Sequence, residues 1–187
     1  IRDLDEAYGV VGAITDDTQM SLFTAEACIQ FALSTESESL YLLENSIKKA
    51  YGRWFNTQVR SDNRVIEANG YLASLPELNN RRGPGNTCMS ALSQGAPVAN
   101  SKGCGGVMRV APIGLFLSER VDLKTIFDIG NRSSRITHGH PTGYLAAGFL
   151  AATIASLLEG TELLETLDCV TSLLKEYDQH NEVLKIV

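Results

Sequence analysis

Paired cysteines, sequence repeats and long uninterrupted apolar runs are all missing from this chain of 187 residues. Its four cysteines form no C-x-x-C pair, so no disulfide scaffold is predicted and we expect reduced thiols in a cytoplasmic protein. The longest apolar run, residues 145–158, contains Gly148, Thr153 and Ser156, and we expect it to be too short and too mixed to span a bilayer. Nothing at the start is typical of a signal peptide.

Positively charged residues are fewer than negatively charged ones. Lys and Arg number 16 against 22 Asp and Glu, which gives a formal net charge of −6. An acidic surface repels phosphate backbones, so general nucleic-acid binding is not expected. A small phosphate ligand remains compatible with this charge, because local backbone amides can bind it. Apolar residues at 44% and charged residues at 20% predict a single globular domain with one hydrophobic core.

Apolar residues recur at spacings of three and four, and no stretch shows sustained alternation with a period of two. This pattern predicts an all-α bundle without strands, in which loops between helices carry the function. The helices are expected at residues 18–33, 37–55, 65–75, 87–94, 107–117, 123–137, 142–158 and 162–177. Pro112 is expected to disturb a turn of the 107–117 helix.

Two adjacent aspartates flanked by threonines, Thr15-Asp16-Asp17-Thr18, come directly before the first of these helices. At a helix N-terminus a hydroxyl and two carboxylates can converge on a hard cation, and magnesium prefers such oxygen ligands. The alternative is a helix cap, in which Thr15 or Asp16 accepts from backbone amides and the acidic charge complements the helix dipole. Both interpretations can hold together.

Three glycines in four positions mark the segment 101–109, which reads Ser-Lys-Gly-Cys-Gly-Gly-Val-Met-Arg. Glycine permits positive φ and close approach of a ligand, and free amides ahead of a helix suit a phosphate. The alternative is a flexible turn. Cys104 is not expected to act as a nucleophile, since no paired histidine is evident. Arg109 is expected to form a structural ion pair.

Two histidines lie two residues apart in the segment 137–142, Thr-His-Gly-His-Pro-Thr. An H-x-H pair binds zinc only when further ligands are near, and the sequence places none beside it. The alternative is that His138 and His140 cap helices beside a turn. We expect this structural role for His140.

These three segments are similar, in the same order, to sequence blocks of the ADP-ribosylglycohydrolase family. They cover residues 14–20 (ITDDTQM), 103–114 (GCGGVMRVAPIG) and 137–142 (THGHPT). The resemblance implies an all-α fold, a single orthogonal helix-bundle domain over residues 1–187, with two Mg²⁺ ions in its cleft. It also implies magnesium-dependent hydrolysis of the N- or O-glycosidic bond that links ADP-ribose to a protein side chain or a small acceptor.

The resemblance also assigns roles to individual residues. Thr15, Asp16 and Asp17 would be metal ligands, and Asp16 and Asp17 would also be the catalytic carboxylates. The residues implied to bind ADP-ribose are Ser101, Gly103, Cys104, Gly105, Gly106, Met108 and His138. The expected partner is an ADP-ribosylated protein or an ADP-ribose-containing small molecule, with no nucleic acid and no membrane.

Two blocks of the family pattern are not found. The family has a Gly-Asp segment before the first block and a C-terminal block near G-x-D-x-D-T, whereas this sequence reads Asp-Gln-His-Asn-Glu after Tyr177. We therefore expect a partial fold, with N- and C-terminal parts missing and at most half of a two-metal ligand set. The main alternative is a non-catalytic ADP-ribose-binding or structural member of the same fold. The sequence is also compatible with a different magnesium-dependent hydrolase and with a helical interaction module.

Overall fold

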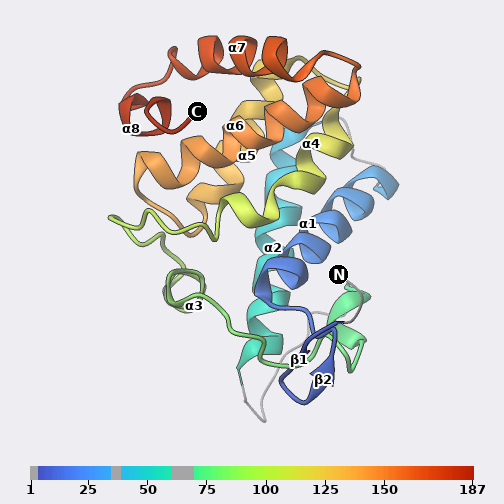
Figure 1. Ribbon diagram of the computed structural model, residues 1–187. Coiled ribbons are helices and arrows are strands. Elements are labelled where there is room, and N and C mark those ends of the chain that lie inside the picture. Colours follow the sequence, from blue (N-terminus) through green and yellow to red (C-terminus); the bar gives the residue numbers. More distant parts are fainter. Residues whose placement is uncertain (1–3, 35–38, 60–69) are drawn as a thin grey trace.

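The computed structural model describes residues 4–34, 39–59 and 70–187, and it confirms an all-α architecture (Figure 1). The helices in these residues are α1 (Asp16–Leu33), α2 (Leu40–Gln58), α3 (Asn86–Gln94), α4 (Ala111–Leu117), α5 (Leu123–Arg135), α6 (Pro141–Leu158), α7 (Leu163–Leu174) and α8 (Asn181–Leu184). Two short 3₁₀ turns, η1 (Leu72–Ser74) and η2 (Val107–Arg109), complete the helical elements.

The helix ends follow local sequence signals. Asp122 caps α5 by accepting from the Thr125 amide at 2.9 Å. Proline at the first position of α6 lacks an amide hydrogen that would have no partner there. Gly95 ends α3 with a φ of +68°, a left-handed conformation that glycine adopts without strain. These signals explain why most predicted boundaries lie within a few residues of the observed ones.

Helix α6 lies at the centre of the bundle and packs most closely against α5. A Cβ on Gly148 would lie 2.7 Å from the Phe127 carbonyl oxygen, so glycine is required for this close approach. The expectation for residues 145–158 did not include the first turn of α6: with 18 residues and a mean hydropathy of 1.4, the whole helix is long and apolar enough to cross a membrane. More than half of it (56%) is buried inside the protein, as expected of a central core helix.

A small hairpin precedes α1, although no strand was expected. Strands β1 (Glu6–Ala7) and β2 (Val10–Val11) pair in antiparallel register around Tyr8 and Gly9, which have φ values of +54° and +72°. Two successive positive φ angles are typical of a tight hairpin turn. Strands of two residues are too short to show alternation, so the sequence pattern could not predict them.

The expected helix at 107–117 is divided in two. Val107–Arg109 forms η2, and α4 begins at Ala111 with Pro112 in its first turn, where proline is tolerated. Part of the expected 65–75 helix lies outside the described residues, and Leu72–Ser74 within it forms η1. The expected start of α2 at Ser37 also lies outside the described residues, and the helix is seen from Leu40.

Candidate active site

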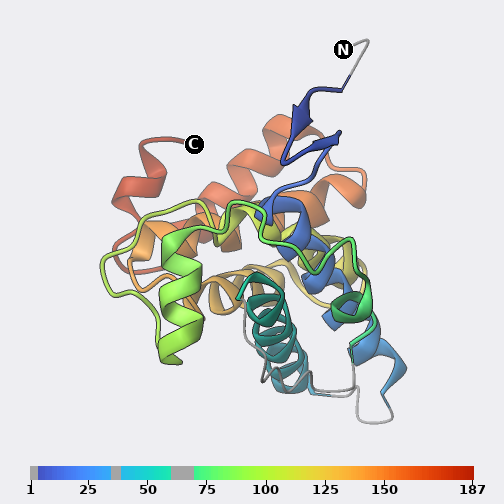
Figure 2. The same ribbon diagram turned by 90° about the horizontal axis from the view of Figure 1, so that it is seen from below.

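The start of α1 is tied to the segment that precedes α3. The Asp16 amide donates to the Arg82 carbonyl at 2.9 Å, and the Gly85 amide donates to Asp16 Oδ2 at 3.0 Å. Thr15 is the N-cap residue, but its hydroxyl donates to Asp17 Oδ2 at 2.9 Å and accepts from no helix amide. The first turn of α1 is therefore organised around its carboxylates (Figure 2 shows the loops before and after α3 beside this end of α1).

A cavity of about 310 Å³ opens at this end of α1. Its walls come from four parts of the chain that are far apart in the sequence. They are α1, the segment before α3, the segment around Gly103–Gly106 (called the glycine loop from here on) and the turn after α5. Of the predicted site residues, the structure brings together Asp16, Asp17, Gly103, Cys104, Gly105, Met108 and His138 around this cavity. The acidic motif, the glycine segment and the histidine turn thus meet at one place.

Three predicted site residues lie outside the cavity lining. Thr15 contacts Asp17 as described above. Ser101 Oγ is 2.8 Å from the Thr87 hydroxyl and accepts from the Gly103 amide at 3.3 Å, so it shapes the loop. Gly106 is packed closely, and a Cβ there would collide with Ser134 Oγ of α5. Ser101 and Gly106 therefore support the shape of the glycine loop. Their predicted contacts with ADP-ribose stay predictions.

Several lining residues were not predicted. They are Gly83, Gly85, Asn86, Thr87 and Cys88, from the segment before α3 and its first turn. The signal that could have found them is a pair of glycines around a proline ahead of a helix, which resembles the signal used for the glycine segment.

An ion pair that holds the glycine loop on its solvent side was also not predicted. Lys102 donates to both carboxylate oxygens of Glu182 in α8, at 2.6 and 2.7 Å, and the Thr142 hydroxyl donates to the same carboxylate at 2.5 Å. The Lys102 contact, followed by the Thr142 contact, lowers the pKa of Glu182 to about 2. The loop is thereby tied to the first turn of α6 from its solvent side.

The glycine loop needs glycine where neighbouring side chains leave no space for a Cβ. None of its three glycines has a positive φ, so conformational freedom is not what requires glycine here. A Cβ on Gly105 would lie 2.8 Å from Cys88 Sγ and 3.0 Å from His138 Cε1, so glycine is required for space. The loop also leads into the three-residue η2 instead of a regular helix. A phosphate site at a helix N-terminus is therefore not formed in the expected way.

His138 is buried beneath this loop, with 1% of its surface exposed. Its Nδ1 lies 2.8 Å from the Thr137 hydroxyl, while Nε2 has no hydrogen-bond partner within the described chain. Burial, and then the positive charge of Arg109, lower the pKa of His138 to about 4, so the ring is neutral at pH 7. His140 has the predicted structural role, because its Nδ1 accepts from the Thr142 amide at the start of α6.

Arg109 corrects one expectation. It is fully buried, and the described residues place no carboxylate within 4.0 Å of it, so the expected ion pair is absent there. Its guanidinium donates to the Ser133 carbonyl at 3.2 Å and to Thr137 Oγ1 at 2.7 Å. It also lies over the Tyr51 ring at 4.0 Å from the centroid. Arg109 therefore places a positive charge behind His138.

The two aspartates have the donor chemistry of a hard-cation site. Burial raises the pKa of Asp16, and the negative charge of Asp17 raises it further, while the Gly85 amide opposes the shift. A divalent cation would relieve this repulsion and would find the oxygen donors that magnesium prefers. Within residues 4–34, 39–59 and 70–187, however, no three His, Cys, Asp or Glu side chains form a metal-binding group. The donors fit magnesium in kind, but in the described residues they are too few for a complete ligand set.

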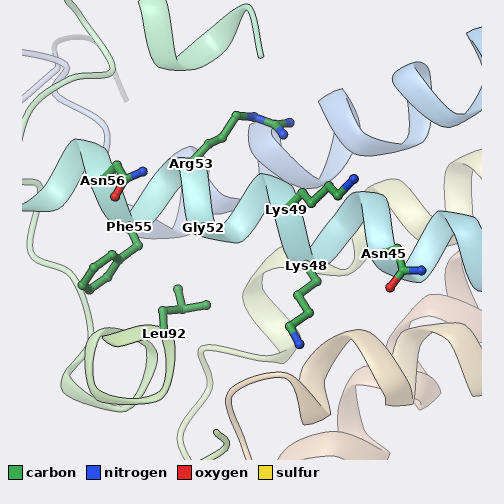
Figure 3. A pocket seen from close by; sticks show the side chains of 8 residues that line it. All are labelled: Asn45, Lys48, Lys49, Gly52, Arg53, Phe55, Asn56 and Leu92. Atoms are coloured by element: carbon green, nitrogen blue, oxygen red, sulfur yellow. The ribbon is translucent and has the colours of Figure 1, made fainter. Parts of the chain in front are cut away.

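A second cavity, of about 540 Å³, lies between α2 and α3 (Figure 3). Lys48, Lys49 and Arg53 of α2 line it, and its described lining contains no carboxylate. Arg53 is nevertheless paired with Glu26 at 2.6 Å, while both lysines are exposed to solvent. The two cavities thus differ in the sign of the charge that they present.

Comparisons with known proteins identify the family. The family model described as ADP-ribosylglycohydrolase matches residues 1–186. A curated relative from Acanthamoeba polyphaga mimivirus, named "Putative ADP-ribosyl glycohydrolase L444", is 26% identical over 167 residues. That match covers 85% of this chain and 30% of the length of the relative. Because the family model matches nearly the whole chain, this protein belongs to the ADP-ribosylglycohydrolase family.

Proposed function

We propose that this chain carries the ligand-binding wall and part of the metal site of a magnesium-dependent hydrolase. The bond cleaved is the N- or O-glycosidic bond that links ADP-ribose to a protein side chain or a small acceptor. The observation that carries the proposal is the single cavity in which Asp16 and Asp17 face the glycine loop and His138. Its volume of about 310 Å³ is at the lower end for small-molecule sites, about 300–1,000 Å³.

The lining residues suggest how the ligand would bind. The small surface of Gly103 and Gly105 lets a diphosphate approach the backbone, and the free nitrogen of His138 lies beside it. The ribose would then face Asp16 and Asp17. One of these carboxylates would take the proton from the attacking water as general base. The anomeric carbon would pass through an oxocarbenium-like transition state, as in other glycoside cleavages.

The metal ligands in this chain would be the carboxylates of Asp16 and Asp17 and the hydroxyl of Thr15. The hydrogen bond from Thr15 to Asp17 already orients one carboxylate. Magnesium, when bound, would supply a Lewis acid that orients the ribose and helps to generate the nucleophile from water.

A second candidate function is binding of ADP-ribose without turnover. The incomplete ligand set favours it, because the described residues place only two carboxylates at the cavity. In this case ADP-ribose binds the purified chain, and ADP-ribosylated substrates remain uncleaved at any magnesium concentration. Chromatographic assay of ADP-ribosyl-arginine, ADP-ribosyl-serine and a simple phosphate ester distinguishes this function, the proposed one and a general phosphatase.

The proposal is tested by removing one negative charge at a time. In Asp16→Asn and Asp17→Asn we expect turnover to fall by at least about 100-fold, because a lost charged interaction of about 3 kcal/mol corresponds to that factor. The natural full-length protein is the form to assay. Full turnover by both variants in excess magnesium would refute the assignment.

A matched control is Glu165→Gln on α7, which removes the same charge from an exposed helix that does not line the cavity. This variant should keep wild-type turnover. Equal losses in the control and in the aspartate variants would show that net charge, rather than the site, controls activity.

A further inference from the structure

The buried guanidinium of Arg109 is linked to the histidine of the cavity by two hydrogen bonds that meet at Thr137. It donates to Thr137 Oγ1 at 2.7 Å, and this oxygen is 2.8 Å from His138 Nδ1. All three side chains are buried, with 0% of Arg109, 0% of Thr137 and 1% of His138 exposed. Water therefore does not compete for these contacts. The donor and the acceptor of each hydrogen bond among the three side chains can then be assigned.

The Thr137 hydroxyl has one proton to donate and can accept two hydrogen bonds. Arginine is always a donor, so Thr137 Oγ1 must accept from Arg109. The hydroxyl proton has three possible acceptors: His138 Nδ1 at 2.8 Å, the Ser134 carbonyl at 3.4 Å and the Cys88 sulfur, which is a weak acceptor. The Ser134 carbonyl already accepts from the amides of Thr137 and His138, both at 3.0 Å. A carbonyl oxygen has two lone pairs, so the proton goes to His138 Nδ1.

We propose that Arg109, acting through Thr137, fixes His138 as the neutral tautomer that carries its proton on Nε2. Arg109 and Thr137 are then positioning residues, and His138 presents an N–H donor to the cavity. The tautomer follows from the hydrogen-bond count alone, whereas the identity of the acceptor rests on the proposed function.

The surroundings of Nε2 indicate what this donor would contact. It has no partner within the described residues, and it lies where a Cβ on Gly105 or Gly103 would approach to 3.3 or 3.5 Å. The two glycines therefore leave room for a ligand atom. A protonated Nε2 cannot bind a metal or take a proton, so the ligand atom must be an acceptor. The nearby charge of Arg109 favours an anionic oxygen, such as a phosphate oxygen of ADP-ribose.

The tautomer can be measured directly by long-range ¹H–¹⁵N NMR of the full chain, with the His138 signals assigned from a His138→Gln variant. We expect an unprotonated, pyridine-like Nδ1 and a protonated, pyrrole-like Nε2. The opposite pattern would overturn the proposal.

Thr137→Val tests whether the hydrogen-bond relay sets this state, because valine keeps the shape of threonine and removes its hydroxyl. We expect the two nitrogen signals of His138 to move toward each other as the second tautomer becomes populated, and the affinity for ADP-ribose to fall about tenfold. Thr137→Ser retains the hydroxyl and should restore the wild-type signals and affinity. Unchanged signals in Thr137→Val would show that the relay does not fix the tautomer.

Arg109→Met is a second variant, and it should give the same change in signals. If the wild-type protein shows the expected tautomer and still binds no ADP-ribose in the presence of magnesium, the proposed function fails and the assignment of the Nε2 proton stands. If ADP-ribose binds and the proton lies on Nδ1, the relay fails and the proposed function stands.

Discussion

The acidic cavity at the start of α1 and the basic cavity between α2 and α3 differ in how they are built. The acidic cavity is assembled from four separate segments, and the hydrogen bond from the Gly85 amide to Asp16 spans 69 residues of sequence. Most of the residues around the basic cavity come from α2 alone (Figure 3).

The difference extends to the state of the polar groups. The acidic cavity contains a carboxylate whose pKa is raised by burial and a buried histidine nitrogen without a partner in the described chain. In the basic cavity, Arg53 is paired with Glu26, its buried Nε has no partner in the described chain, and the lysines are solvated. An unpartnered buried nitrogen therefore occurs at both cavities, and the raised pKa of Asp16 and the lowered pKa of His138 are what distinguish the acidic one, because perturbed pKa values cluster at functional sites. The larger and more charged cavity is therefore not the better candidate site.

Magnesium should distinguish the two cavities with the largest effect. A concentration 100-fold above the dissociation constant would stabilise the folded chain by about 2.7 kcal/mol, which raises the melting temperature by several degrees. The increase, measured by differential scanning fluorimetry, should be lost in Asp16→Asn and retained in Lys48→Ala. If only the lysine variant lost the increase, magnesium would act at the basic cavity, and the proposed metal ligands Asp16 and Asp17 would be wrong.

Adding one methyl group should have opposite effects at the two cavities. Gly105→Ala introduces a Cβ 2.8 Å from Cys88 Sγ, and we expect it to cost about 1–3 kcal/mol in the free energy of unfolding. Gly52→Ala on α2 meets nothing within 4 Å and should stabilise the chain by about 0.5–1 kcal/mol, because alanine favours a helix. Urea denaturation measures both changes, and a neutral Gly105→Ala would remove the packing argument for the loop.

Acid should destabilise the acidic cavity through His138. Its pKa is about 4 in the folded chain against an ordinary value of 6.5, so the folded state disfavours the charged ring. This stability is fully present above about pH 6.5 and is lost as the pH falls toward 4. Between pH 7 and pH 5, we expect His138 to account for about 1–2 kcal/mol of lost unfolding free energy.

The measurement compares urea unfolding of wild type and His138→Gln at both pH values. The glutamine variant should lose less stability on acidification. A His140→Gln variant serves as the control, since that ring is a partly exposed helix cap. Equal acid sensitivity in wild type and His138→Gln would contradict the buried neutral ring.

Much of the site could be predicted from local patterns. Asp16, Asp17, Gly103–Gly105 and His138 belong to the three motifs singled out in the sequence, and they line one cavity. The helices were predictable because burial of one helix face imposes a period that is visible in the sequence. The two-residue strands were missed, because elements this short carry no period. The disturbed turn at Pro112 was predicted, whereas the separate three-residue η2 before it was not.

By itself, the sequence determined the all-α class and the family, through apolar periodicity and three motifs that each lie within a short stretch of chain. Only the tertiary structure decided which of those residues face one another. It placed Cys88 in the cavity, packed Gly106 against Ser134, and left Arg109 without a carboxylate among the described residues. The physical reason is that periodicity and turn chemistry act between near neighbours in the chain. The environment of a buried charge, by contrast, depends on segments that meet only when the chain folds.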